Sequence, residues 1–250
     1  MSTSVENQRV AKAAGVIMIA MLLSRILGFV REQALTTQFG LTYLTDAYFA
    51  AFAIPDLLYN LLVGGALSSA FIPVFSSYLA RDKEDEAWEI ASTVINIAVI
   101  GLLIGIILGE IFTPALIPLV ARKFQGEKLL LTIHLSRIMF PAVLFTGLNG
   151  LMMGILNSYK NFAYPAIGAV LYNVGIIAMG VLLGPRIGVA GFSIGVIVGV
   201  LLNFFIQFPT LIRKRKLKYR PIINFRHPGV IEIGALMIPA IIGLSVSQSV

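Results

Sequence analysis

The 250-residue sequence contains no cysteine, and only 12% of its residues are charged. Disulfide bonds and thiolate metal sites are therefore excluded, and the cellular compartment cannot be inferred from the redox state of cysteines. Soluble domains usually carry roughly 25% charged residues. The two histidines, His134 and His227, are isolated and have no ligand partners at useful spacing, so we expect no metal site and no cofactor.

Sequence motifs of catalysis are also missing: no nucleophile elbow, Walker loop or zinc-protease helix is present. We therefore expect a protein that is not an enzyme. Apolar residues make up 58% of the chain, and its mean hydropathy is +0.90. Apolar runs of about 20 residues, long enough to cross a bilayer as helix, recur along the whole length. They do not alternate as barrel strands would, so the fold class is an all-α polytopic transmembrane helical bundle.

We expect six complete spans and the start of a seventh. The second and third runs are longer than a bilayer is thick, so they tilt or project beyond the lipid. No small-residue cleavage site closes the first run, which we interpret as a retained helix. The predicted spans are residues 12–38, 46–79, 88–121, 129–156, 163–184 and 189–211, with the last beginning near 230.

Lysine and arginine are distributed unevenly between the two sets of loops. One set holds twelve of them and the other holds four, while three lie within spans. The richer set includes the N-terminus, so the positive-inside rule predicts a cytoplasmic N-terminus. Because the basic residues lie at the ends of spans, the net charge of +7 does not indicate a nucleic-acid partner.

The richest basic segment divides the chain. We expect a six-helix lobe over residues 1–212, a basic cytoplasmic linker over 213–228, and the truncated start of a second lobe over 229–250. The linker serves as a topology anchor or contacts anionic membrane lipids. The sequence stops about 20 residues into the seventh span, which predicts that a C-terminal lobe is missing.

The segment "MLLSRILGFVRE" places charges inside the first span. Arg25, Gly28 and Glu32 share one face of a helix, and Arg31 lies about 120° away, in line with Ser24 and Gly28. An arginine at the centre of a span raises the free energy of membrane insertion by about 2.5 to 3.5 kcal/mol on experimental insertion scales. Two such arginines indicate a hydrated cavity.

These charges allow a structural reading and a functional one. Arg25 could pair with Glu32 to hold helices together, and Arg31 could snorkel to the interface. Pairing leaves one arginine without an acid, however, and the planar guanidinium suits a phosphate because it donates two parallel hydrogen bonds. We therefore predict that Arg25 and Arg31 contact an anion.

The second span carries further candidates. Asp46 follows Thr45 at the start of the helix, where a carboxylate can cap free backbone N–H groups. Pro55 interrupts the run and predicts a bend. Asp56 and Asn60, four residues apart, place polar groups on one face beside it, as in the wall of a cavity.

Weaker signals follow. Arg137, eight residues into the fourth span, is a possible third positive charge in the cavity. The glycines of "GVAGFSIGVIVGV" indicate close helix packing. Isolated polar residues in apolar surroundings are more typical of interhelical hydrogen bonds than of a binding site; they are Glu110, Asn149, Asn157, Asn173, Asn203 and Gln207.

Several segments resemble the MurJ (MviN) family of lipid II flippases. They are "SRILGFVRE", "TDAYFAAFAIPDLL", "GALSSAFIPVF", "GILNSYKNFAYPAIGAVLYN" and "PAIIGLSVSQS". The resemblance runs over essentially the whole chain. It implies membership of the multidrug/oligosaccharidyl-lipid/polysaccharide exporter superfamily, with two six-helix lobes around a central cavity and a length about twice that of this chain.

The resemblance also implies a function and site residues. Such proteins move lipid II, the undecaprenyl-diphosphate-linked peptidoglycan precursor of the cell wall, across the bacterial cytoplasmic membrane. It makes Arg25 and Arg31 the residues that hold the diphosphate, Asp46 a functional acid, and Glu32 the acid that follows the second arginine. Some members have paired arginines where this chain has Tyr59 and Asn60, so the site carries less positive charge in this chain.

Other functions stay open at this point. The transporter could move another polyprenyl-linked glycan or act as a multidrug exporter, although an exporter of cations would want acids in its interior. A membrane scaffold would not need charges within its spans. An intramembrane enzyme acting on lipid diphosphates would need an acid cluster or a histidine base. The expected mechanism is alternating access, with the headgroup passing between two lobes and with the coupling ion left open.

Overall fold

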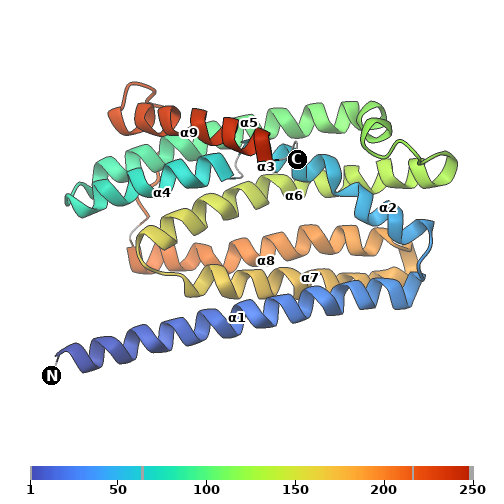
Figure 1. Ribbon diagram of the computed structural model, residues 1–250, viewed down its shortest axis with the longest axis horizontal. Coiled ribbons are helices and arrows are strands. Elements are labelled where there is room, and N and C mark those ends of the chain that lie inside the picture. Colours follow the sequence, from blue (N-terminus) through green and yellow to red (C-terminus); the bar gives the residue numbers. More distant parts are fainter. Residues whose placement is uncertain (1, 63–64, 216, 248–250) are drawn as a thin grey trace.

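The computed structural model describes residues 2–62, 65–215 and 217–247. The regular structure in those ranges is helical throughout, which confirms the all-α polytopic bundle (Figure 1). The helices are α1 (Ser2–Phe39), α2 (Tyr43–Ala51), α3 (Ala53–Leu62), α4 (Gly65–Ala80), α5 (Glu84–Val120), α6 (Gly126–Ser158), α7 (Ala163–Ile187), α8 (Ala190–Arg215) and α9 (Pro228–Ser247).

In the described part of the chain, five helices are long and apolar enough to cross a membrane. They are Ala14–Phe39, Glu84–Val120, Gly126–Ser158, Ala163–Ile187 and Ala190–Ile212. The predicted second span is not one continuous helix, because α2, α3 and α4 follow one another along it. The 37 residues of α5 make it roughly 55 Å long at 1.5 Å per residue, longer than the hydrocarbon core.

The break between α2 and α3 falls at Phe52, three residues before Pro55. Proline has no backbone N–H, so the carbonyl oxygen of Ala51 loses its helical donor. The hydroxyl of Ser136 in α6 donates to that oxygen at 2.8 Å. The bend is therefore fixed by a hydrogen bond from a neighbouring helix.

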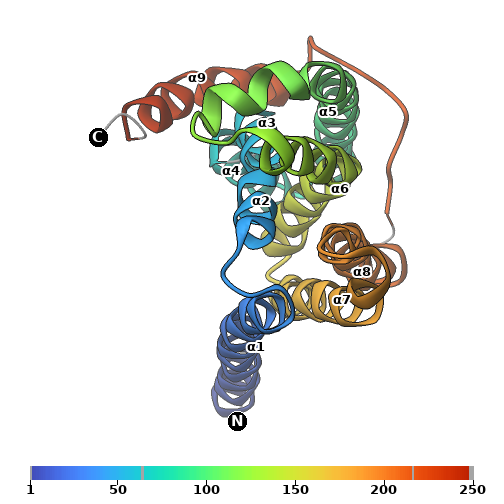
Figure 2. The ribbon, with the colours of Figure 1, turned by 90° about the vertical axis from the view of Figure 1, so that its right-hand side faces the viewer.

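The loops alternate between the two ends of the bundle. Figure 1 shows the N-terminus, the α4–α5 turn, the α6–α7 turn and the linker at one end, and the α1–α2, α5–α6 and α7–α8 connections at the opposite end. The two sets of loops inferred from the basic residues are thus separated in space. Figure 2 shows α1 at one edge of the bundle and α9 at the far edge.

Helices α7 and α8 are in direct backbone contact. A Cβ atom added at Gly175 would lie 2.6 Å from the Cα of Gly199, and one added at Gly195 would lie 2.8 Å from the Cα of Ile176. Only glycine allows this approach, as the sequence predicted.

The buried apolar side chains of the described residues form two clusters. One lies between α4, α5 and α6, where the rings of Phe75 and Trp88 meet edge to face at 6.0 Å. The other joins α1, α2, α6 and α8 around Leu35, Tyr48 and Phe192. The second cluster holds α1 and α2 beside the cavity described below.

Residues 217–227 run without helix along the first turns of α5. The Asn96 side chain donates to the carbonyl oxygen of Ile222 at 2.8 Å, and the Ser92 hydroxyl accepts from the backbone N–H of Arg220 at 3.0 Å. Beyond this segment α9 packs against α4 and α5. Helix α8 continues to Arg215, three residues into the predicted linker, and Lys216 lies outside the described residues.

Candidate functional site

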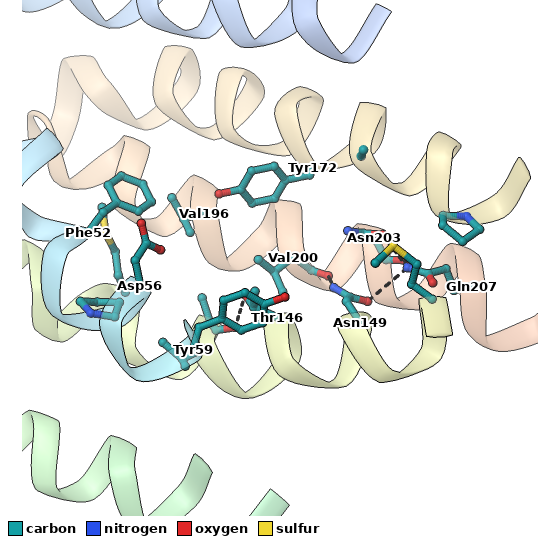
Figure 3. Close-up of a pocket in the computed structure, with 18 residues that line it drawn as sticks. Phe52, Asp56, Tyr59, Thr146, Asn149, Tyr172, Val196, Val200, Asn203 and Gln207 are labelled. Carbon is teal, nitrogen blue, oxygen red and sulfur yellow. Dashed lines mark hydrogen bonds between the residues drawn. The ribbon is translucent and has the colours of Figure 1, made fainter. Parts of the chain in front are cut away.

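A cavity of about 350 Å³ lies between α3, α6, α7 and α8, beside the bend at Phe52. Its described lining includes one carboxylate, that of Asp56, and no basic side chain. Figure 3 shows Asp56, Phe52 and Tyr172 toward one end, and Asn149, Asn203 and Gln207 toward the other. The cavity therefore has an acidic, aromatic end and an amide end.

The amide end is an ordered network. Asn149 donates to the carbonyl oxygen of Val200 at 3.1 Å, and the amide nitrogen of Gln207 donates to the side-chain oxygen of Asn203 at 2.7 Å. The interhelical role predicted for Asn149 is thus confirmed. The side-chain oxygen of Gln207 is buried and has no hydrogen-bond partner among the described residues.

The acidic end lies just past the bend. Asp56 is exposed, and no basic side chain of the described residues forms an ion pair with it. The predicted wall residue Asn60 does not line the cavity; Tyr59 does so instead. Adjacent residues point in different directions from a helix, so the direction of the bend decides whether Tyr59 or Asn60 faces the cavity.

On α1, Ser24 and Gly28 face α7. The Ser24 hydroxyl donates to the carbonyl oxygen of Ala169 at 3.3 Å, and the Asn173 side chain donates back to Ser24 at 3.3 Å. A Cβ at Gly28 would approach the Asn173 side-chain oxygen to 4.0 Å. These two residues therefore fix how α1 rests on α7.

The positive charge of Arg31, on α1, acts on the hydroxyls of Tyr48 and Tyr172. Its side chain is 22% exposed, and its closest carboxylate is that of Glu32, at 3.8 Å. Both the Nε of Arg31 and the hydroxyl of Tyr48 are buried without a hydrogen-bond partner among the described residues. A guanidinium N–H and a hydroxyl that both lack a hydrogen-bond partner can both donate to an anion.

The pair of Arg25 with Glu32, which was the alternative structural reading, does not form among the described residues. Glu32 lies beside Arg31 instead, with 53% of its side chain exposed. The reason is distance: seven residues of helix separate Cα atoms by roughly 10.5 Å. Arg25 is exposed on a helix at the edge of the bundle (Figure 2), so the structure does not bring the two arginines into one contact.

Asp46 is not the cap of its helix. Thr42 is the N-cap: its hydroxyl accepts from the N–H of Leu44, and its own N–H donates to the hydroxyl of Thr45. Asp46 forms an ion pair with Lys128 of α6 at 2.6 Å. Three residues separate Asp46 from the cap residue Thr42, so its carboxylate is free to reach the next helix.

Arg137 lies outside the described cavity lining. It extends from α6 to α5, where it donates to the carbonyl oxygen of Glu110 at 3.2 Å and lies 3.8 Å from the carboxylate of the same residue. In the described part of the chain no group of three metal-binding side chains is present.

The sequence pattern of the lipid II flippase MurJ family matches residues 35–249. The chain belongs to the MurJ family. The matched range begins at Leu35, so Arg25 and Arg31 precede it. MurJ proteins are transporters rather than enzymes, and they act in the membrane stage of peptidoglycan synthesis.

Two similar proteins and one distant structure show how far the likeness reaches. Lipid II flippase MurJ of Burkholderia cenocepacia is 34% identical over 91% of this chain and 45% of its own. A lipid II flippase MurJ structure in an inward closed conformation is 30% identical, covers 90% of this chain and 47% of that one, and has a TM-score of 0.73. The Vibrio cholerae MATE transporter VcmN in its bent form shares the fold alone, at 15% identity, a TM-score of 0.72 and coverage of 96% and 55%. The chain spans about half the length of the curated MurJ relatives it matches.

Tyr172 and the meeting of three amides were not predicted from the sequence. The signal available was weak: Asn203 and Gln207 are four residues apart, which places them on one face of α8. Their partner Asn149 lies in another helix, so no spacing within the sequence could reveal the cluster.

Proposed function

We propose that the chain forms one lobe of a transporter that carries lipid II from the inner to the outer leaflet of the bacterial cytoplasmic membrane. The observation that supports this most is the state of Arg31: it is half-buried, its charge acts on two tyrosine hydroxyls, and no carboxylate of the described residues lies within hydrogen-bond distance of it. A guanidinium held in this way is prepared to receive a diphosphate. Membership of the MurJ family supplies the substrate class.

In this proposal each α1 residue has a separate task. Arg31 binds the diphosphate, and Arg25, on the open face of the same helix, draws the anionic headgroup in from the membrane surface. Ser24 and Gly28 hold α1 on α7, and Glu32 limits how far the Arg31 side chain can swing. Asp46 holds α2 to α6 at the end opposite the N-terminus.

We also place the N-terminus in the cytoplasm, because its end of the bundle carries most of the loop lysines and arginines. Residues 1–212 then form the first lobe and 213–228 the linker, while residues 229–250 begin a second lobe. Lobe movement about the site exposes the headgroup alternately on the two sides, while the polyprenyl chain stays in the lipid.

The test uses the intact gene in a bacterium whose own lipid II flippase is depleted. The readout is the precursor that an added headgroup-cleaving hydrolase can reach from outside. Hydrogen bonds to charged groups contribute about 1.5–3 kcal/mol each, so Arg31→Ala should lower this exposed precursor on the order of tenfold or more, and Arg31→Lys less. Arg186→Ala removes a charge from an exposed site at the end of α7 and serves as the control. Undiminished export by Arg31→Ala at equal protein level would contradict the proposal.

A multidrug exporter is the second candidate, and Asp56 favours it because a carboxylate in the cavity suits a cation. The same strain distinguishes the two. An exporter would protect cells from organic cations and leave the exposed precursor unchanged.

A further inference from the structure

Among the described residues, the lining of the cavity between α3, α6, α7 and α8 offers hydrogen-bond acceptors and no positive charge. This polarity is opposite to that of Arg31 nearby. The hydroxyl of Tyr172 lies within electrostatic range of both Arg31 and Asp56, so an anion-binding group and a cation-binding group flank one side chain. A ligand that touches both must carry both signs of charge.

The free acceptor at the amide end is fixed by its network. The Asn149 amide nitrogen donates to the backbone oxygen of Val200, so its side-chain oxygen faces Gln207. The Gln207 nitrogen serves that oxygen and the oxygen of Asn203. The remaining oxygen of Gln207, which is 1% exposed as a residue, accepts no hydrogen bond from the part of the chain that the structure describes. A buried acceptor of this kind requires a donor from a ligand or water.

The acidic end has the features of an ammonium site. Phe52, Tyr59 and Tyr172 line the cavity around Asp56, and Figure 3 shows the Tyr172 hydroxyl directed toward the Asp56 side of the cavity. Aromatic faces attract ammonium groups through their quadrupoles, and the carboxylate supplies the counter-charge.

The spacing argues against a metal ion. Figure 3 places Asp56 and Gln207 toward opposite ends of the cavity, whereas a hard cation needs several oxygens converging at about 2.3–2.6 Å. An extended organic group can reach both ends, and the volume of about 350 Å³ is within the usual range of ligand pockets.

We propose that this cavity binds a primary ammonium group carried by the headgroup of the transported lipid. Asp56 is its counter-ion, the Gln207 oxygen accepts a hydrogen bond from an amide or hydroxyl of the same headgroup, and Arg31 holds the diphosphate. The inference rests on the proposed function and makes it more specific, because it assigns a recognition site for the amine of the headgroup in addition to the diphosphate site.

The test compares two probes for binding to the purified protein from the intact gene. One is a polyprenyl-diphosphate disaccharide bearing a lysine-containing peptide, and the other is the same lipid with the lysine amine acetylated. The wild-type protein should bind the free amine on the order of tenfold more tightly. Asp56→Asn should remove this preference, so that the two lipids bind alike.

A charge-balanced variant provides the control. Asp56→Asn combined with Asn60→Asp keeps the net charge but moves the carboxylate to a position outside the cavity lining, so the preference should stay lost. Equal binding of both lipids by the wild type overturns the inference and leaves the proposed function intact. A preference that persists in Asp56→Asn, or that depends on added sodium, also overturns it. If neither lipid binds, the proposed function itself fails.

Discussion

The hydroxyl of Ser136 donates a hydrogen bond to the carbonyl oxygen of Ala51, 2.8 Å away. That oxygen has no helical donor because Pro55 occupies the position from which it would come. The bond therefore replaces a missing link of one helix with a side chain of another. It also sets the angle at which α3 carries Asp56 into the cavity.

Removing this hydroxyl should destabilise the protein. Ser136→Ala leaves the Ala51 oxygen buried without a donor, which costs about 1–3 kcal/mol. Thermal unfolding of the detergent-solubilised protein, followed by circular dichroism, measures the change. Ser158→Ala is the matched control, because its hydroxyl bonds to Gly154 within its own helix. Equal loss in the two variants would contradict the role assigned to Ser136.

The ion pair of Asp46 with Lys128 predicts linked phenotypes. If Asp46 acts by joining α2 to α6, Lys128→Gln should reduce export of the precursor to the same degree as Asp46→Asn. The exchange of both residues, Asp46→Lys with Lys128→Asp, should restore part of it. The stability effect should stay small, about 0.2–1 kcal/mol, because the pair is partly exposed. Loss of export in Asp46→Asn alone would show a role for the carboxylate beyond this pair.

The contact of the linker with α5 should resist ordinary changes of pH. The hydrogen bond from Lys218 to Asp85 raises the pKa of Lys218 above its usual 10.5. A raised pKa means that the pair stabilises the folded state at lower pH and is lost only as pH rises through the raised value. Hydrogen exchange at the amide of Arg220, corrected for the intrinsic rate, should therefore be equally slow at pH 7 and pH 9.

Asp85→Asn should speed that exchange at both pH values. The control is Glu86→Gln, which removes a neighbouring acid paired with Lys83 and should leave the linker protected. Protection that falls between pH 7 and pH 9 in the wild type would contradict the assignment.

Because these 250 residues contain no cysteine, thiols introduced into this part of the chain can report its orientation. Arg81→Cys and Lys123→Cys place single thiols on exposed turns at opposite ends of the bundle (Figure 1). A membrane-impermeant maleimide added to intact cells should label position 123 and reach position 81 only after the cells are opened. The reverse pattern would place the N-terminus outside.

The helical character and the order of the apolar runs could be read from the sequence, because each run must satisfy its own backbone in lipid, but the division of the second run into α2, α3 and α4 could not. Pro55 likewise predicted a bend. Its direction, which decides whether Tyr59 or Asn60 faces the cavity, could not be predicted. Pairing across helices was harder to foresee. Lys128 lies 82 residues from Asp46, and the amides that meet Gln207 come together only through the packing of α6 on α8.

Where charges lay close in sequence, spacing alone misled. Arg25 and Glu32 share a helical face, yet they are two turns apart and Glu32 adjoins Arg31. The Nε of Arg31 is buried and has no hydrogen-bond partner among the described residues, which no local pattern specifies.

The contact between Gly175 and Gly199 has a mechanical consequence. No layer of side chains separates the two backbones at this contact. We therefore expect α7 and α8 not to slide past each other but to move as one rigid unit. Any rearrangement of the bundle is then confined to the contacts that this pair makes with the other helices and to the bend near Phe52, where a single hydrogen bond from Ser136 replaces the helical one.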